Sequence, residues 1–257
     1  MLQQQFAVAW LGHASVLARC GGVNVLVDPV LSERIGYRIA GRTIGPRRLS
    51  DAPVHAEALR GAADLLLITH AHFDHLDRPT LRVLADARTT VVVPKGCARL
   101  IPKGFCDVVE LRAQDTPDVC GLRVESMEPN HRGERHAWDR HRKALSYVVR
   151  WDAGGALFAG DTAMTHAFDA LQGLDLAVFG IGAYNPRTHA HATPEQAWAM
   201  FKACGATKLL PVHHSTFHMS DEPMDEPMQR LIAAAGEERA RVVEAELGET
   251  KALGTGH

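Results

Sequence analysis

Four side chains of types that commonly bind metal ions lie within six residues of the chain: His70, His72, Asp74 and His75. They follow residues 65–69, an apolar run with the length of a buried strand. Side chains two residues apart point the same way on an extended chain, whereas on a helix they would lie about 200° apart. The spacing therefore predicts that His70 and His72 bind one metal ion. A turn after them would direct Asp74 and His75 to a second ion.

The overall composition also favours a metalloprotein. The 257 residues include 15 histidines, and 46% of residues are hydrophobic and 23% charged, as in ordinary globular proteins. This balance argues against a disordered or fibrous chain. The 28 basic and 30 acidic residues give a formal net charge of −2, far from the basic balance of a nucleic-acid-binding protein. We therefore expect no nucleic-acid partner.

The sequence predicts neither a membrane span nor a secretion signal. Residues 176–186, the longest nearly uncharged stretch, are about half a membrane span and are interrupted by glycines. Residues 1–10 lack the basic start of a signal peptide. The five cysteines show no CxxC spacing, which predicts free thiols rather than disulfides or a thiolate zinc site. We expect a cytoplasmic protein without an integral membrane segment.

Short apolar runs recur along the whole chain and predict strands. The turn-forming residues 152–155 predict a hairpin, so at least part of the sheet structure is expected to be antiparallel. The predicted strands are residues 8–11, 23–27, 65–69, 90–93, 122–127, 147–151, 156–159, 176–181 and 208–212. We expect an α/β fold in one domain, residues 1–257, with two sheets covered by helices.

Helix signals lie between these strands. The clearest is a capping box, in which Thr193 caps the helix, Pro194 occupies its first position and Gln196 completes the box. A second helix is predicted to begin near Asp77, and a third to span residues 227–235. Strands and helices therefore intermix rather than segregate.

The ligand-rich segment and four other motifs resemble the metallo-β-lactamase superfamily. The first motif of that superfamily is similar to residues 25–29, which place Asp28 at a strand end, and the second to residues 70–75. The remaining three motifs are similar to residues 129–131, 158–162 and 211–213. The resemblance extends over nearly the whole chain. It implies a four-layer αββα sandwich with metal ions in the cleft between the sheet edges.

The resemblance also implies ligands for two divalent metal ions, with Asp28 supporting the ligand loop. One ion would be bound by His70, His72, His131 and Asp161. The other would be bound by Asp74, His75, Asp161 and His213, so that Asp161 bridges the two. Because the set contains nitrogen and oxygen ligands and no thiolate, zinc is favoured, with manganese or iron as alternatives.

Four further stretches, residues 10–15, 44–48, 181–187 and 214–217, resemble one branch of the superfamily. This branch contains N-acyl-phosphatidylethanolamine-hydrolysing phospholipase D and ascorbate-6-phosphate lactonase-like proteins. By position, His191 matches a histidine that assists the scissile group, and the alternative is a structural role next to the capping box. Asp74 is expected to be catalytic through the second ion, and His13 to be structural or supporting. After the last ligand the branch often has Trp-Gly, where this chain has His-Ser.

The resemblance implies a binuclear metal-dependent hydrolase, and the favoured activity is that of a phospholipase D-like phosphodiesterase using a metal-bridging hydroxide. A lactonase acting on an anionic sugar or acyl lactone is an alternative, as is a di-iron redox protein on the same fold. Basic residues in 31–50 and 132–143 favour a small-molecule or lipid-like anionic substrate if these loops border the cleft. A solvated surface is the other interpretation of these charges. A homo-oligomer is compatible with the sequence.

Overall fold

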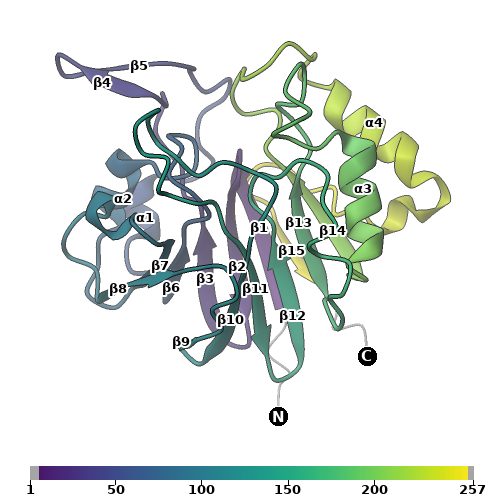
Figure 1. Ribbon diagram of the computed structural model, residues 1–257, viewed down its shortest axis with the longest axis horizontal. Coiled ribbons are helices and arrows are strands. Elements are labelled where there is room, and N and C mark those ends of the chain that lie inside the picture. Colours follow the sequence, from purple (N-terminus) through teal and green to yellow (C-terminus); the bar gives the residue numbers. More distant parts are fainter. Residues whose placement is uncertain (1–5, 254–257) are drawn as a thin grey trace.

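The protein is built around two β-sheets in the computed structural model, which describes residues 6–253 (Figure 1). The first sheet consists of β1 (Phe6–Gly12), β2 (Ser15–Cys20), β3 (Val23–Val27), β6 (Leu65–Leu67), β7 (Thr90–Pro94), β8 (Asp107–Leu111) and β15 (Thr250–Leu253). The second consists of β9 (Asp118–Val119), β10 (Leu122–Met127), β11 (Ser146–Trp151), β12 (Gly154–Phe158), β13 (Leu176–Gly180) and β14 (Lys208–Val212). A separate hairpin, β4 (Tyr37–Ile39) with β5 (Arg42–Ile44), extends away from both sheets.

Each sheet contains a parallel part that ends at the same edge of the sandwich. The strand orders are β15-β1-β2-β3-β6-β7-β8 and β14-β13-β12-β11-β10-β9. Strands β3, β6, β7 and β8 run parallel in the first sheet, as do β12, β13 and β14 in the second. In open sheets, ligand sites form at the carboxyl ends of parallel strands. Those ends are where the predicted ligands follow β6, β12 and β14.

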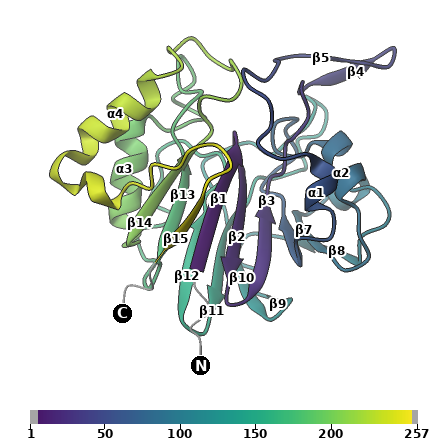
Figure 2. The same ribbon diagram turned by 180° about the vertical axis from the view of Figure 1, so that it is seen from behind.

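Helices cover the outer face of each sheet, which gives four layers (Figure 2). The helices are α1 (Ala56–Leu59), α2 (Arg78–Leu84), α3 (Pro194–Ala203) and α4 (Glu226–Ala235), with 3₁₀ turns at Ala98–Leu100 and Gly236–Arg241. In β6, Leu65 and Leu67 join the core between the sheets, whereas Leu66 packs in the core that contains Leu81 of α2. Strands buried on both faces explain the continuous apolar runs in the sequence. The chain thus has the predicted αββα sandwich.

Local signals in the sequence proved reliable for helix starts and for the hairpin. Thr193 and Gln196 form both bonds of the capping box of α3, and the carboxylate of Asp77 accepts from the Thr80 backbone N–H at the start of α2. The predicted hairpin at 152–155 joins the antiparallel strands β11 and β12. These predictions are confirmed, because capping and turn formation depend on neighbouring residues.

Three strands end earlier than predicted, and several elements, most of them short, were not predicted at all. Strand β6 ends at Leu67 because the Thr69 N–H donates to a carboxylate oxygen of Asp28, at 2.8 Å, instead of to a neighbouring strand. Likewise β12 ends at Phe158 rather than at 159, and β13 ends at Gly180 rather than at 181. The elements missed are β2, β4, β5, β8, β9, β15 and α1. The predicted domain limits, residues 1 and 257, lie outside the described residues.

Candidate metal centre

The loop after β6 carries the first ligand candidates and is held in place by Asp28. Its carboxylate accepts from the backbone N–H and the hydroxyl of Thr69, at 2.8 and 2.5 Å, and its Oδ2 lies 2.7 Å from His75 Nδ1. Asp28 is buried and has a left-handed backbone with φ of 41°. A left-handed backbone is strained in a residue other than glycine, and such strain is concentrated at functional sites. A carboxylate behind a ligand histidine orients the ring and its proton, as the resemblance implied for Asp28.

His70, His72, His131 and Asp161 form one group, and their ligand atoms lie within 4.8 Å of one another. The His70 Nε2 and His131 Nε2 atoms lie 2.9 and 3.4 Å from His72 Nδ1, and each lies 3.7 Å from Asp161 Oδ2. The other ring nitrogen of His131 is 2.8 Å from the carbonyl oxygen of Ala190, which orients that ring. The structure therefore brings together the four residues expected to bind the first ion.

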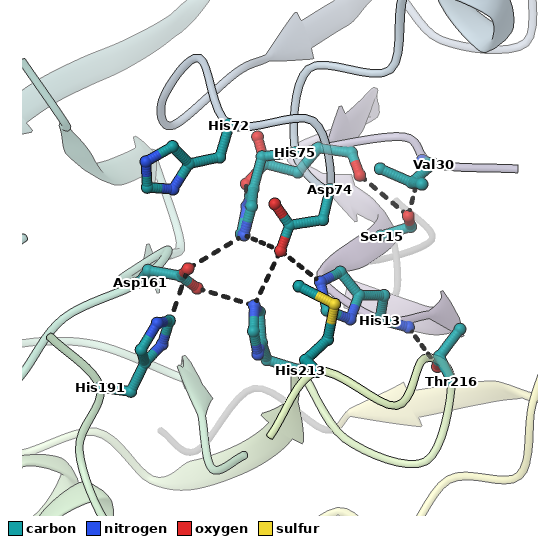
Figure 3. Close-up of polar contacts among 12 residues, drawn as sticks. His13, Ser15, Val30, His72, Asp74, His75, Asp161, His191, His213 and Thr216 are labelled. Atoms are coloured by element: carbon teal, nitrogen blue, oxygen red, sulfur yellow. Dashed lines mark hydrogen bonds and ion pairs between the residues drawn. The ribbon is translucent and has the colours of Figure 1, made fainter. Parts of the chain in front are cut away.

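A second group contains His13, Asp74, His75 and His213, again with ligand atoms within 4.8 Å of one another. The His213 Nε2 atom lies 3.4 Å from Asp74 Oδ2 and 3.3 Å from Asp161 Oδ1, and His75 Nε2 lies 3.2 Å from Asp161 Oδ2. Asp161 thus lies between the two groups, facing ligand atoms of both (Figure 3). All seven residues predicted as ligands converge on one site.

His13 is a part of this site to which sequence reasoning gave only a supporting role. It follows β1, and its Nε2 lies 3.0 Å from Asp74 Oδ2, on the opposite side of that carboxylate from His75 and Asp161 in Figure 3. Its backbone oxygen accepts from the N–H of His213, at 2.9 Å, and joins the two ligand segments. Burial, together with His213, lowers the pKa of His13 to about 3. A histidine at the end of a strand was the signal available in the sequence.

His191 lies beside Asp161, with Nδ1 3.7 Å from Asp161 Oδ2, and it lines the same cleft. Within residues 6–253 its side chain makes no hydrogen bond to the start of α3, so the structural role considered from the sequence has no such contact to rest on. Burial lowers the pKa of His191 to about 3, despite the charge of Asp161. The ring is therefore a neutral imidazole facing the cleft.

The donor set fits metal ions because it leaves inward-facing nitrogens without protein partners. His75 Nε2 and both ring nitrogens of His213 are buried and make no hydrogen bond of good geometry in the described chain. Unpaired buried polar atoms are rare, since each costs about 1–3 kcal/mol. Imidazole nitrogens and carboxylate oxygens without thiolates suit zinc, manganese or iron.

Charges in the cluster are strongly coupled. Burial works against ionisation of Asp74 and Asp161, but the surrounding histidines outweigh it and hold both pKa values well below the usual range. Burial likewise opposes protonation of His213, yet Asp161 and Asp74 together raise its pKa to about 9. Because metal binding requires neutral imidazoles, a metal ion would replace protons at this position.

The cluster lines a cleft of about 620 Å³ with mixed charges. Arg132 and Arg187 line it together with Glu128 and Glu134, and Arg132 lies 3.6 Å from Glu134. No residue of 31–50 is among the described residues that line this cleft. The condition attached to the two basic loops is therefore met in part: Arg132 and Glu134 of 132–143 line the cleft, and no described residue of 31–50 does.

The comparisons with known proteins identify the family. The family described as Beta-lactamase superfamily domain matches residues 23–214, and the chain belongs to this superfamily. A solved structure with the same fold is Igni18, a metallo hydrolase from the archaeon Ignicoccus hospitalis. It has 20% sequence identity and a TM-score of 0.73, and the match covers 98% of this chain and 99% of that one. The four-layer architecture is thus that of the metallo-β-lactamase fold.

Curated relatives add information on related activities. An uncharacterized protein from Mycobacterium tuberculosis is 34% identical over 93% of this chain and 66% of its own length. The mitochondrial N-acyl-phosphatidylethanolamine-hydrolyzing phospholipase D of Saccharomyces cerevisiae is 28% identical over 94% of this chain and 55% of its own length. A 4-amino-L-phenylalanyl carrier-protein 3-hydroxylase from Streptomyces venezuelae is 33% identical over 62% of this chain and 29% of its own. The chain thus spans less than two thirds of these relatives.

Within the described residues, none of the helices has both the length and the apolar character that crossing a membrane requires.

Proposed function

We propose that this protein is a binuclear metal-dependent hydrolase that cleaves phosphodiesters. The observation that carries the proposal is the position of the Asp161 carboxylate, 3.2–3.7 Å from ring nitrogens of both histidine groups at the wall of an open cleft. Shared carboxylates of this kind are typical of two-metal sites. The proposed ligands are His70, His72, His131 and Asp161 for one ion, and Asp74, His75, Asp161 and His213 for the other.

Bound divalent ions, with zinc favoured, would supply an activated water and neutralise charge on the oxygens of the group under attack. The protein's own residues would do the rest. Asp28 would keep the proton of His75 on Nδ1, so that Nε2 stays free toward the centre. His13 would hold Asp74 in place through its 3.0 Å contact. As a neutral imidazole, His191 would donate a hydrogen bond from its ring N–H to the leaving oxygen, from the wall of the cleft.

One observation supports a phosphodiester, and a second supports an anionic substrate in general. The relatives named N-acyl-phosphatidylethanolamine-hydrolyzing phospholipase D include the yeast protein and one from Caenorhabditis elegans, 26% identical over 93% of this chain. In addition, Arg132 and Arg187 supply cationic groups to the cleft. A guanidinium group forms paired hydrogen bonds with phosphate oxygens. We therefore propose an anionic small-molecule or lipid-like substrate.

The test is a side-by-side hydrolysis assay of the metal-reconstituted protein on bis(p-nitrophenyl) phosphate and on a set of lactones. Asp74→Ala serves as the inactive variant, and Asp152→Ala, in the exposed hairpin turn, as the matched control. We expect phosphodiester turnover that Asp74→Ala abolishes and Asp152→Ala leaves unchanged. Turnover of lactones alone would contradict the proposal and favour the lactonase alternative.

A di-iron redox protein is the second candidate, and the similarity to the Streptomyces hydroxylase is the observation that favours it. The same nitrogen and oxygen ligands accept iron as well as zinc. Elemental analysis of the purified protein separates the two candidates. Zinc or manganese together with hydrolysis would favour the hydrolase, whereas two irons without hydrolysis would favour the redox protein.

A further inference from the structure

A second cavity, of about 280 Å³, shares no lining residue with the metal-site cleft. It lies between the β4–β5 hairpin, the start of α2 and the loop that carries Arg135 and His136. In Figure 1 the hairpin extends over the side of the molecule where α2 lies. The cavity has room for a small polar group, and it is too small for a macromolecule.

The lining of this cavity is strongly cationic. Five arginines contribute to it: Arg34, Arg38, Arg78, Arg82 and Arg135. The carboxylate of Asp77 is the acidic group among the described lining residues, and its Oδ2 already accepts from the hydroxyls of Ser32 and Thr80, each at 2.5 Å. The positive charge of the cavity is thus left largely uncompensated.

Three of the arginines also lack partners of their own. Within residues 6–253, no ion pair or side-chain hydrogen bond involves the guanidinium of Arg38, Arg78 or Arg82, and the Nε of Arg78 is buried without a partner. By contrast, the nearby Arg47 is paired with a carboxylate, since its Nη2 lies 2.7 Å from Glu33 Oε1. Five arginine side chains grouped around a single carboxylate repel one another, unless a further anion lies between them.

Arg135, another arginine of the cavity, is held in place by stacking and by hydrogen bonds. The guanidinium carbon of Arg135 lies 3.9 Å from the ring centroid of Phe73, and its Nη1 donates to the carbonyl oxygens of Ala71 and Leu76, at 3.0 and 2.8 Å. Burial, with the nearby charge of Arg78, lowers the pKa of Arg135 to about 10. Desolvation and repulsion of this kind are both relieved by a bound anion. A stacked, hydrogen-bonded arginine loses little conformational entropy on binding.

We propose that this arginine pocket, defined by Arg34, Arg38, Arg78, Arg82 and Arg135, binds the phosphate group of a phosphate monoester at a site separate from the metal centre. Several guanidinium groups facing one small cavity match the doubled charge and the three oxygens of such a group. A carboxylate would neutralise less of the charge. The phosphate group could belong to a small soluble molecule or to a lipid headgroup such as that of phosphatidic acid.

Binding of phosphate monoesters to the metal-reconstituted protein tests the proposal. Isothermal titration uses glycerol 3-phosphate as the soluble probe, and sedimentation uses vesicles of phosphatidylcholine with and without phosphatidic acid. The variants are Arg78→Gln, at the cavity, and Arg38→Gln, on the exposed hairpin where a folding defect would not arise. The matched control is Arg42→Gln, on the same hairpin with the same loss of charge but outside the cavity lining.

We expect Arg78→Gln and Arg38→Gln each to weaken binding of at least one probe about tenfold, because each removes a charge-assisted contact. Arg42→Gln should bind as the unmodified protein does. A loss confined to vesicles with phosphatidic acid would identify a lipid headgroup, and a loss with glycerol 3-phosphate a soluble ligand. Unchanged binding in both cavity variants, or an equal loss in Arg42→Gln, would overturn the proposal. The readout is binding, so it is independent of the proposed hydrolysis.

Discussion

Replacing Asp28 by asparagine should weaken metal binding without changing any proposed ligand. The carboxylate takes three contacts, from Thr69 N, Thr69 Oγ1 and His75 Nδ1, at 2.8, 2.5 and 2.7 Å. Asparagine keeps the size and tolerates the left-handed backbone at this position, where φ is 41°. However, its amide group has one oxygen in place of two, and it carries no charge.

The magnitude follows from these contacts. If the amide nitrogen faces His75, then Nδ1 must accept, and the imidazole proton moves to Nε2, the atom that faces Asp161 at 3.2 Å. If it faces the Thr69 N–H instead, that donor is left unpaired. Either arrangement costs about 1.5–3 kcal/mol for a hydrogen bond to a charged group. This corresponds to about a tenfold to hundredfold weaker metal affinity, the range known for residues behind metal ligands.

The assay is competition for zinc against a chromophoric chelator, with the melting temperature of the metal-free protein as a second readout. The matched control is Asp64→Asn, because Asp64 is exposed just before β6 and its carboxylate accepts only from the Asn24 N–H among the described contacts. The control should keep its affinity. An Asp28→Asn variant with zinc affinity within about twofold of the unmodified protein would refute the reasoning, since no donor would then have been lost.

Three further predictions concern the site. His13→Ala removes the 3.0 Å contact to the ligand carboxylate of Asp74, so elemental analysis should find fewer than two ions per chain, and two retained ions would argue against the role. His191→Ala should lower kcat by about 10²–10³-fold with metal content unchanged, as expected of a hydrogen-bond donor to the leaving oxygen, and a loss of metal instead would indicate a ligand. Gly182→Ala places a Cβ against the carbonyl oxygen of His213 and should lower the melting temperature more than Gly121→Ala, where no atom lies within 4 Å and the left-handed backbone, with φ of 80°, is the only obstacle. Equal melting temperatures for these two glycine variants would show that the backbone around the last ligand yields readily.

Much of the architecture was predictable because it depends on neighbouring residues. The apolar runs of β3, β6 and β14 reflect burial on both faces, and the capping box of α3 is satisfied within four residues of sequence. Most of the strands that were missed are short or partly exposed, such as β8, in which Asp107 is exposed and Val108 to Glu110 are only partly buried, whereas β2 was missed although four of its six residues are buried. A half-exposed strand has no strong apolar pattern to detect.

The types and spacing of His70, His72, Asp74 and His75 were sufficient to predict metal ligands, because a strand end holds alternate side chains in one direction. Which distant residues complete the two groups could be inferred only by resemblance, since their positions depend on how the two sheets pack. The contact between His13 and Asp74 joins residues 61 positions apart in sequence. No local pattern reports a contact of that kind.

The arginine pocket shows the same difference between what the sequence predicts and what the fold decides. The sequence showed an excess of basic residues in 31–50 and 132–143, but a count of charges does not show which cavity each side chain lines. The folded chain separates these charges: Arg132 lines the metal-site cleft, whereas Arg38 and Arg135 line a different cavity. Ligand chemistry is thus encoded in residue types and short spacings. The grouping of those residues into sites is decided by tertiary packing, because only packing brings side chains from separate segments within contact distance.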